Sequence, residues 1–129
     1  MLLLKKRLFS DQKLLGRWGE KRCLKFLKRK GLHPLTRNFS CKLGEIDLIM
    51  VDGIGSIVFV EVKCRSNEDF TPTETLITAD KQQKMANTAQ YFLKTHNIDN
   101  RPYRFDIVTI VLENNGRQQI NHYENAFVL

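Results

Sequence analysis

The segments GEIDLI (residues 44–49) and VFVEVK (residues 58–63) decide the fold, because each is an apolar run of the length of a strand. Between them, residues 52–56 read Asp-Gly-Ile-Gly-Ser, a composition typical of a turn. Two strand-like runs joined by a few turn residues predict an antiparallel β-hairpin. We therefore expect paired strands at about 45–51 and 57–64.

Four charged side chains lie on this otherwise apolar hairpin. Because side chains alternate between the faces of a strand, Glu45 and Asp47 share one face, as do Glu61 and Lys63. A turn centred near Ile54 would place Asp47 opposite Glu61 and Glu45 opposite Lys63. Like charges directly opposite each other destabilise a sheet. The paired carboxylates of Asp47 and Glu61 therefore indicate a bound divalent cation.

Bulk composition narrows the class of protein. The chain has 129 residues, 42% of them hydrophobic, which suits one domain and excludes a disordered chain. No apolar run is long enough to span a membrane, and Met1–Leu4 before a basic cluster is too short for a signal peptide, so we expect a cytoplasmic protein. The three cysteines and three histidines lack the spacing of disulfide or zinc sites, so we expect structural or surface roles for all six.

The charge is distributed unevenly. Residues 1–37 carry twelve Lys and Arg against two acids, a net +10, whereas the rest of the chain carries a net −3. This asymmetry predicts a polyanion-binding surface beside an acidic, metal-binding pocket. We expect residues 1–11 to form a basic arm and residues 12–129 to form a single domain.

Hydrophobic periodicity and turn residues predict seven elements in the order α-β-β-β-α-β-β. They are a helix at 12–30 ending before Gly31, strands at 33–41, 45–51 and 57–64, a helix from a capping box at 71–74 to about His96, a strand at 104–112, and an edge strand at 117–124 after a turn at 114–116. This order predicts an α/β fold with a mixed sheet in two or three layers.

Five charged residues fall where the local pattern points inward: Glu20 and Lys81 in the apolar arcs of the two helices, and Asp47, Glu61 and Lys63 on the hairpin. Five such charges from four elements are better explained as one site than as separate ion pairs. The carboxylates of Asp47 and Glu61 would hold Mg²⁺ or Mn²⁺. Lys63 could then orient or deprotonate a water, or neutralise charge in a transition state.

Simpler interpretations stay open. Glu-x-Lys is common on strands, and Glu45 with Lys63 could be an ordinary cross-strand ion pair. The basic face of the first helix could be an ordinary solvated surface. Trp18, on that basic side, could be a core residue.

Taken together, these motifs closely resemble the YraN-like family of small bacterial proteins over about residues 12–112. The motifs that carry the resemblance are Gly16-x-x-Gly19-Glu20, Arg37-Asn38, the two hairpin segments with Arg65, Lys81, and Arg104-Phe105-Asp106-Ile107-Val108. No single motif is specific, but the combination is. That family is largely uncharacterised and is classed with the restriction-endonuclease-like, PD-(D/E)XK nucleases.

The resemblance implies a restriction-endonuclease-like mixed β-sheet flanked by helices. By position, Asp47 is the first acid of the nuclease motif, Glu61 the second, Lys63 its lysine, and Glu20 an additional helix acid that would share the metal. The chain departs from the motif in lacking a Pro-Asp pair, since Ile46 precedes Asp47. The basic residues expected to contact nucleic acid are Arg17, Lys21, Lys25, Lys28, Arg37, Arg65 and Lys81.

The function expected from these features is a metal-dependent endonuclease that hydrolyses phosphodiester bonds in DNA, including branched or damaged DNA. Because one chain supplies one site, cutting both strands would need a homodimer or two encounters. The alternatives are a non-catalytic nucleic-acid-binding module of the same fold and a subunit whose basic helix docks an acidic protein. Paired inward carboxylates favour the nuclease, because a pure binding module has no need of them.

Overall fold

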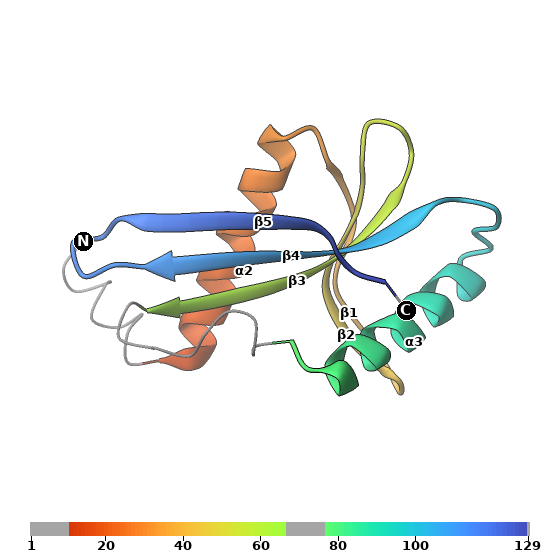
Figure 1. Ribbon diagram of the computed structural model, residues 1–129, viewed down its shortest axis with the longest axis horizontal. Helices are drawn as coiled ribbons and strands as arrows, with labels where there is room; N and C mark the ends of the chain where they lie inside the picture. The colour runs from red at the N-terminus through yellow and green to blue at the C-terminus, as the bar shows by residue number, and fades with distance from the viewer. Residues whose placement is uncertain (1–10, 67–76, 129) are drawn as a thin grey trace.

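The computed structural model describes residues 11–66 and 77–128, which form a twisted sheet with a helix on each face (Figure 1). The elements are α2 (Gln12–Arg29), β1 (His33–Cys41), β2 (Gly44–Val51), β3 (Ile57–Ser66), α3 (Ala79–Thr95), β4 (Tyr103–Leu112) and β5 (Gln118–Phe127). The predicted α/β class, the mixed sheet and the element order are confirmed. Residues 1–10 of the predicted basic arm lie outside the described residues.

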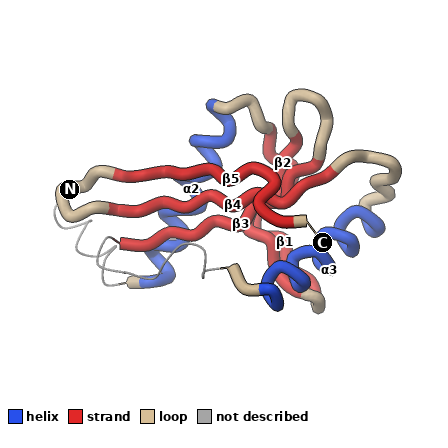
Figure 2. The backbone as a smooth tube through the Cα atoms, in the orientation of Figure 1, coloured by secondary structure: helices blue, strands red, loops and turns tan. Residues whose placement is uncertain are grey.

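The sheet has its five strands in sequence order, β1-β2-β3-β4-β5. β3 and β4 are parallel, and the other neighbouring strands are antiparallel. A parallel pair needs a crossover connection, which α3 supplies between β3 and β4. The three antiparallel pairs are linked by short turns, as Figure 2 shows.

Helix α2 covers one face of β3 and β4. Asp11 caps its first turn by accepting a hydrogen bond from the Leu14 backbone N–H at 3.1 Å. The helix ends where predicted, before Gly31, whose φ of +96° suits a residue after a helix C-terminus. Its buried residues Cys23 and Leu27 pack with valines of β3 and β4. Trp18 is half-buried against the same apolar side, which favours the core interpretation of that residue.

Helix α3 covers the opposite face. Its buried Met85, Ala89 and Phe92 pack with Phe59 and Phe105 of the sheet. The predicted start of this helix was wrong: Thr78 is extended and caps the helix by accepting from the Lys81 backbone N–H at 3.1 Å, so α3 begins at Ala79. The predicted capping box at residues 71–74 lies outside the described residues.

The β2–β3 hairpin has the predicted register but a short paired region. Its pairs run from Val51–Ile57 at the turn to Leu48–Val60, after which the two strands separate. Figure 1 shows the β1–β2 hairpin turned steeply against β3–β5. The predicted pairing of Glu45 with Lys63 was therefore wrong, because both residues lie beyond the paired region, and no ion pair joins them among the described residues.

The two strands at the C-terminal side are longer than predicted. β5 continues to Phe127, which pairs with Phe105 across an irregularity in the β4–β5 ladder.

None of the helices in the described part of the chain is both long and apolar enough to cross a membrane.

Candidate active site

Asp47 occupies the place where β2 and β3 separate. Continuing the register by one step beyond Leu48–Val60 puts Asp47 beside Glu61, as predicted. The Asp47 carboxylate accepts a hydrogen bond from the Val62 backbone N–H at 2.8 Å. The side chain thus satisfies a β3 backbone donor that lacks its strand partner, which fixes the carboxylate against β3.

Glu61 is a buried carboxyl group, with 4% of its surface exposed. The pKa of Glu61 is raised to about 8, mainly by burial and also by the neighbouring Asp47, through a hydrogen bond from the protonated Glu61 and through its charge. Lys81 and Lys63 act in the opposite direction. Two carboxylates held side by side in a poorly solvated place therefore retain a proton at neutral pH.

Two lysines from different elements approach Glu61. Lys81 Nζ on α3 lies 3.3 Å from Glu61 Oε2, and Lys63 Nζ on β3 lies 3.8 Å from the same oxygen. About one third of each lysine side chain is exposed, so each ammonium group faces both the carboxylate and solvent. This arrangement places positive charge where a phosphate could reach it.

Glu20 reaches the site from α2 because Gly19 lets the helix approach β3 closely. A Cβ atom at Gly19 would lie 2.6 Å from Cys64 Cβ, so only glycine fits this contact. Burial raises the pKa of Glu20, and the charge and hydrogen bonding of Asp47 raise it further, whereas Arg37 lowers it. Asp47 therefore interacts with both Glu20 and Glu61.

The Arg37-Asn38 pair has a role at this site that the sequence did not reveal. With its amide nitrogen turned toward Glu20, Asn38 donates to both carboxylate oxygens at 3.2 Å. Asn38 holds a φ of +52°, a left-handed conformation that asparagine tolerates better than most residues. The pair thus orients Glu20, and Arg37 lies close enough to affect the pKa of Glu20.

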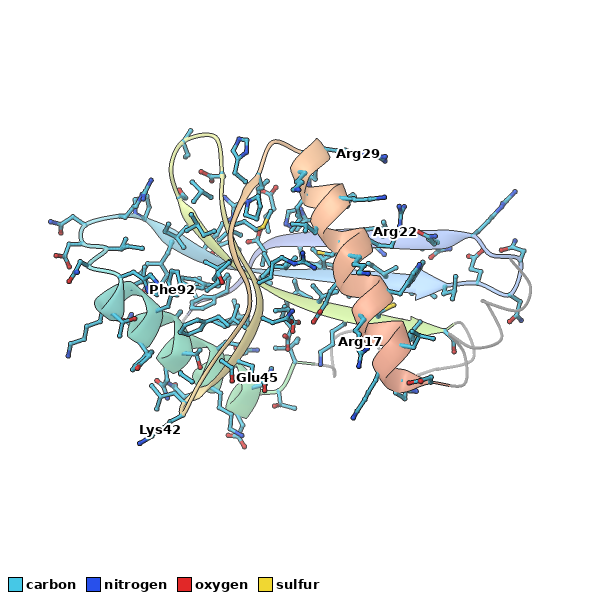
Figure 3. The ribbon with its side chains drawn as sticks, turned by 180° about the vertical axis from the view of Figure 1, so that it is seen from behind. Arg17, Arg22, Arg29, Lys42, Glu45 and Phe92 are labelled. Carbon is cyan, nitrogen blue, oxygen red and sulfur yellow. The ribbon has the colours of Figure 1, made fainter. Side chains whose placement is uncertain are left out.

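The remaining predicted nucleic-acid contacts occupy three places. Arg17, Lys21, Lys25 and Lys28 are exposed along α2, and Figure 3 shows this helix crossing the sheet beside the β1–β2 hairpin. Arg65 is half-buried near the end of β3. Lys81 belongs to the carboxylate cluster, where its acidic partner among the described residues is Glu61.

The donor chemistry fits a hard divalent cation, although the ligands are not assembled as a closed set. Carboxylate oxygens from Asp47 and Glu61, with Glu20 beside them, are the ligands that Mg²⁺ and Mn²⁺ prefer. Within residues 11–66 and 77–128, no three His, Cys, Asp or Glu side chains converge closely enough to hold a metal as they stand. A cation at this place would replace the proton held by Glu61, and the metal stays a prediction.

Cys23 on α2 lies near Asp47 and Glu20, whereas His122 belongs to a second buried network. Its Nε2–H donates to Asp106 at 2.8 Å, and Lys30 donates to its Nδ1 at 2.7 Å. Arg104 binds both Asp106 and Asp52. The signal for this network was Asp106 itself, an acid within a strand that is otherwise buried.

Burial raises the pKa values of the Cys23 and Cys64 thiols to about 12, so both thiols stay protonated.

The fold and site together define a small α/β protein with a buried cluster of carboxylates and lysines where two parts of its sheet separate. Residues 19–110 match the uncharacterised protein family UPF0102, and the chain belongs to that family. The resemblance to the YraN-like family is thereby confirmed.

Relatives in this family match nearly end to end. A UPF0102 protein of Caldicellulosiruptor saccharolyticus is 41% identical over 118 residues, which cover 91% of this chain and 99% of that protein. A UPF0102 protein of Pelotomaculum thermopropionicum is 38% identical over 117 residues, covering 90% and 97% of the two chains. A UPF0102 protein of Pseudomonas fluorescens is 40% identical over 113 residues, covering 87% and 91%.

Solved structures show only a distant likeness. Pyrococcus furiosus SfsA in complex with Ca²⁺ has a TM-score of 0.37 and 15% identity, covering 88% of this chain and 64% of that one. A structure of an EndoMS–dsDNA2 complex has a TM-score of 0.26 and 12% identity, covering 79% and 42%.

Proposed function

We propose that the protein is a metal-dependent endonuclease acting on DNA, with Asp47, Glu61 and Lys63 as its catalytic residues and Glu20 as an assisting acid. The observation that supports this proposal is the pairing of Asp47 with the buried Glu61, whose pKa is raised to about 8. A purely structural role for a buried carboxyl group beside a half-buried one is costly. A catalytic role explains why the fold retains them.

The residues of the site suggest how the reaction would be assisted. Asp47 and Glu61, with Glu20, would hold Mg²⁺ or Mn²⁺, which supplies an activated water and stabilises charge on the phosphate. Lys63 would orient or deprotonate the attacking water, or offset the negative charge that develops on the phosphate. Lys81 lies against the same oxygen of Glu61 and would hold a neighbouring phosphate oxygen. Cytoplasmic localisation and a homodimer stay predictions.

A cleavage panel tests the proposal. Linear, nicked, flap and four-way-junction DNA, with RNA as a further substrate, are incubated with the protein and Mn²⁺. We expect cleavage of at least one substrate, and its loss in Asp47→Asn and Glu61→Gln. The matched control is Asp99→Asn, which removes an exposed carboxylate in the loop before β4. Cleavage that persists in both site variants would contradict the proposal.

The second candidate is a nucleic-acid-binding module without catalysis, favoured by the exposed basic face of α2. Reversing Lys21 and Lys25 to Glu should lower DNA affinity and flatten the plot of log affinity against log salt by roughly one unit per lost phosphate contact. The control reverses two other exposed lysines, Lys42 and Lys94, with the same change in net charge. Equal effects of the two double variants would place the contact surface elsewhere.

Binding that follows this pattern without cleavage of any substrate would favour the second candidate. Binding no better than that of a charge-matched control protein would favour the third, a subunit whose basic helix docks an acidic protein. The proposed nuclease activity requires both phosphate binding and the dependence on Asp47 and Glu61.

A further inference from the structure

A cavity of about 460 Å³ lies on the face of the sheet that α3 covers. Its volume falls within the range of roughly 300–1,000 Å³ typical of small-ligand sites. The residues of its lining that matter here are Ile77, Gln82, Ile107, Tyr123, Asn125 and Phe127. The candidate active site does not use any of them.

The strand register joins the cavity to the site. Glu61 on β3 pairs with Ile107 on β4, and Ile107 pairs with Tyr123 on β5, so the three residues form one row across the sheet. Paired residues on neighbouring strands point to the same face. Two strand spacings, roughly 10 Å, separate Glu61 from Tyr123. This is the scale of the separation between a nucleotide phosphate and a nearby base.

Helix α3 bridges the same two places from above the sheet. Lys81 Nζ lies 3.3 Å from Glu61, and the next residue, Gln82, lines the cavity. A phosphate at Lys81 would therefore have the cavity directly beside it. The wall of the cavity formed by β5 is also held in place. Asn125, with a φ of +50°, donates its backbone N–H to the buried Asp106 at 2.9 Å.

The chemistry of the lining suits a flat heteroaromatic ring. Tyr123 offers an aromatic ring with 45% of its surface exposed, and Ile77, Ile107 and Phe127 supply apolar contacts. The amides of Gln82 and Asn125 can both donate to and accept from the polar edge of a base. Glu124, also at the wall, lies 3.8 Å from Lys30.

We propose that this cavity binds one unpaired nucleobase of a nucleic-acid strand whose phosphate lies at Glu61 and Lys81. The inference rests on the proposed function, because it takes the substrate to be a nucleic acid. A base within a duplex is stacked between its neighbours and has to leave the stack to enter such a cavity. The preferred substrate is therefore single-stranded DNA, or DNA with an unpaired segment such as a flap.

Equilibrium binding of two short single strands tests the proposal. One strand carries its bases and the other is an abasic strand of the same length and charge; both are measured by fluorescence anisotropy with Ca²⁺ present. We expect the wild-type protein to bind the base-containing strand about fivefold to a hundredfold more tightly, the scale of stacking one base on an aromatic ring. Tyr123→Ala should lose most of this preference, and Tyr123→Phe should keep it, because the ring remains.

The matched control is Tyr91→Ala, since Tyr91 on α3 is also 45% exposed but does not line this cavity. It should retain the wild-type preference. Equal affinity of wild-type protein for the two strands overturns the cavity proposal and leaves phosphate binding standing. An equal loss of preference in Tyr123→Ala and Tyr91→Ala also overturns it. Failure to bind either strand also overturns this proposal, and the cleavage panel on duplex and branched DNA then decides the proposed function separately.

Discussion

At the scale of single residues, the raised pKa of Glu61 makes the stability of the protein depend on pH. Its pKa is raised by burial and by Asp47, so the folded protein binds a proton there more tightly than the unfolded chain does. Stability is then lost as the pH rises from the unfolded pKa, about 4.3, through the folded value of about 8. At neutral pH the site therefore lowers the free energy of unfolding of the metal-free protein.

We therefore expect Glu61→Gln to stabilise the metal-free protein. The gain should be largest near pH 8, roughly 1–3 kcal/mol, and should disappear near pH 4, where the wild-type carboxyl is protonated in both states. Urea denaturation in a chelator at several pH values measures it. A Glu61→Gln protein less stable than wild type at pH 8 would show that the Lys63 and Lys81 contacts outweigh the repulsion.

Lys63 is the second residue whose role the structure sharpens. Its acidic neighbour is Glu61 at 3.8 Å and not Glu45, so a structural cross-strand pair no longer competes with catalysis. Lys63→Met keeps most of the side-chain volume and should leave the melting temperature nearly unchanged. Cleavage should fall by roughly a hundredfold or more, the scale for losing one positioned group that stabilises developing charge.

Lys81→Met and Glu45→Gln serve as comparisons. Lys81→Met tests whether one lysine at Glu61 is sufficient, and Glu45→Gln should leave cleavage nearly intact. If Lys63→Met lowers the stability and does not reduce cleavage, Lys63 is structural.

At the scale of elements, contact between α2 and β3 sets the position of Glu20. A Cβ at Gly19 would lie 2.6 Å from Cys64 Cβ and 2.9 Å from its Sγ, whereas a Cβ at Gly16 meets nothing within 4 Å. Gly19→Ala should therefore force the helix away from β3 and destabilise the protein by about 1–3 kcal/mol. Gly16→Ala, one turn earlier, should stabilise it by about 0.5–1 kcal/mol.

Chemical denaturation of the two glycine variants, with cleavage assays alongside, measures both effects. Gly19→Ala should also reduce cleavage, because Glu20 follows Gly19 directly and moves with the helix. A Gly19→Ala protein as stable and as active as Gly16→Ala would show that the close contact does not position the site.

The elements also show how far the sequence alone could predict this structure. Local periodicity and turn residues predicted the seven elements and the register that places Asp47 beside Glu61. The separation of β2 from β3 beyond Leu48 was not predictable, because it depends on the twist of the assembled sheet. The predicted start of α3 was wrong because the sequence has a threonine suited to capping a helix at both position 71 and position 78, and Thr78 is the N-cap of α3.

The Asp106–His122 contact was missed for a related reason. The residues are 16 positions apart on neighbouring strands, and His122 pairs with Val108, so its contact with Asp106 is diagonal. An acid inside a buried strand was visible in the sequence, but its partner depended on the register between β4 and β5. The basic face of α2 was predicted correctly because helical periodicity is a local property.

At the scale of the whole molecule, the Asp106 network joins parts that are distant in sequence. Asp106 is fully buried and connects through Arg104 to Asp52 at the β2–β3 turn, and through His122 to Lys30 at the end of α2. It also holds the Asn125 backbone at the wall of the cavity. The network therefore fixes β5 and the β2–β3 turn in relation to α2.

We expect this network to make the whole fold sensitive to acid. Burial alone would raise the pKa of Asp106, but hydrogen bonds from His122, the Asn125 N–H and Arg104 outweigh it and hold the pKa below its usual value. A lowered pKa contributes stability above the unfolded value, about 3.9, and this contribution is lost as the pH falls through the folded value. Asp106→Asn should cost about 3–5 kcal/mol at pH 7, because it leaves Arg104 without its buried partner. The stability of Asp106→Asn should then fall less than that of wild type between pH 5 and pH 3.

The control is Asp99→Asn, which changes an exposed side chain and should follow the wild type. Thermal unfolding across this pH range measures both effects. Parallel plots of stability against pH for wild type and Asp106→Asn would show that acid acts on the fold through other groups.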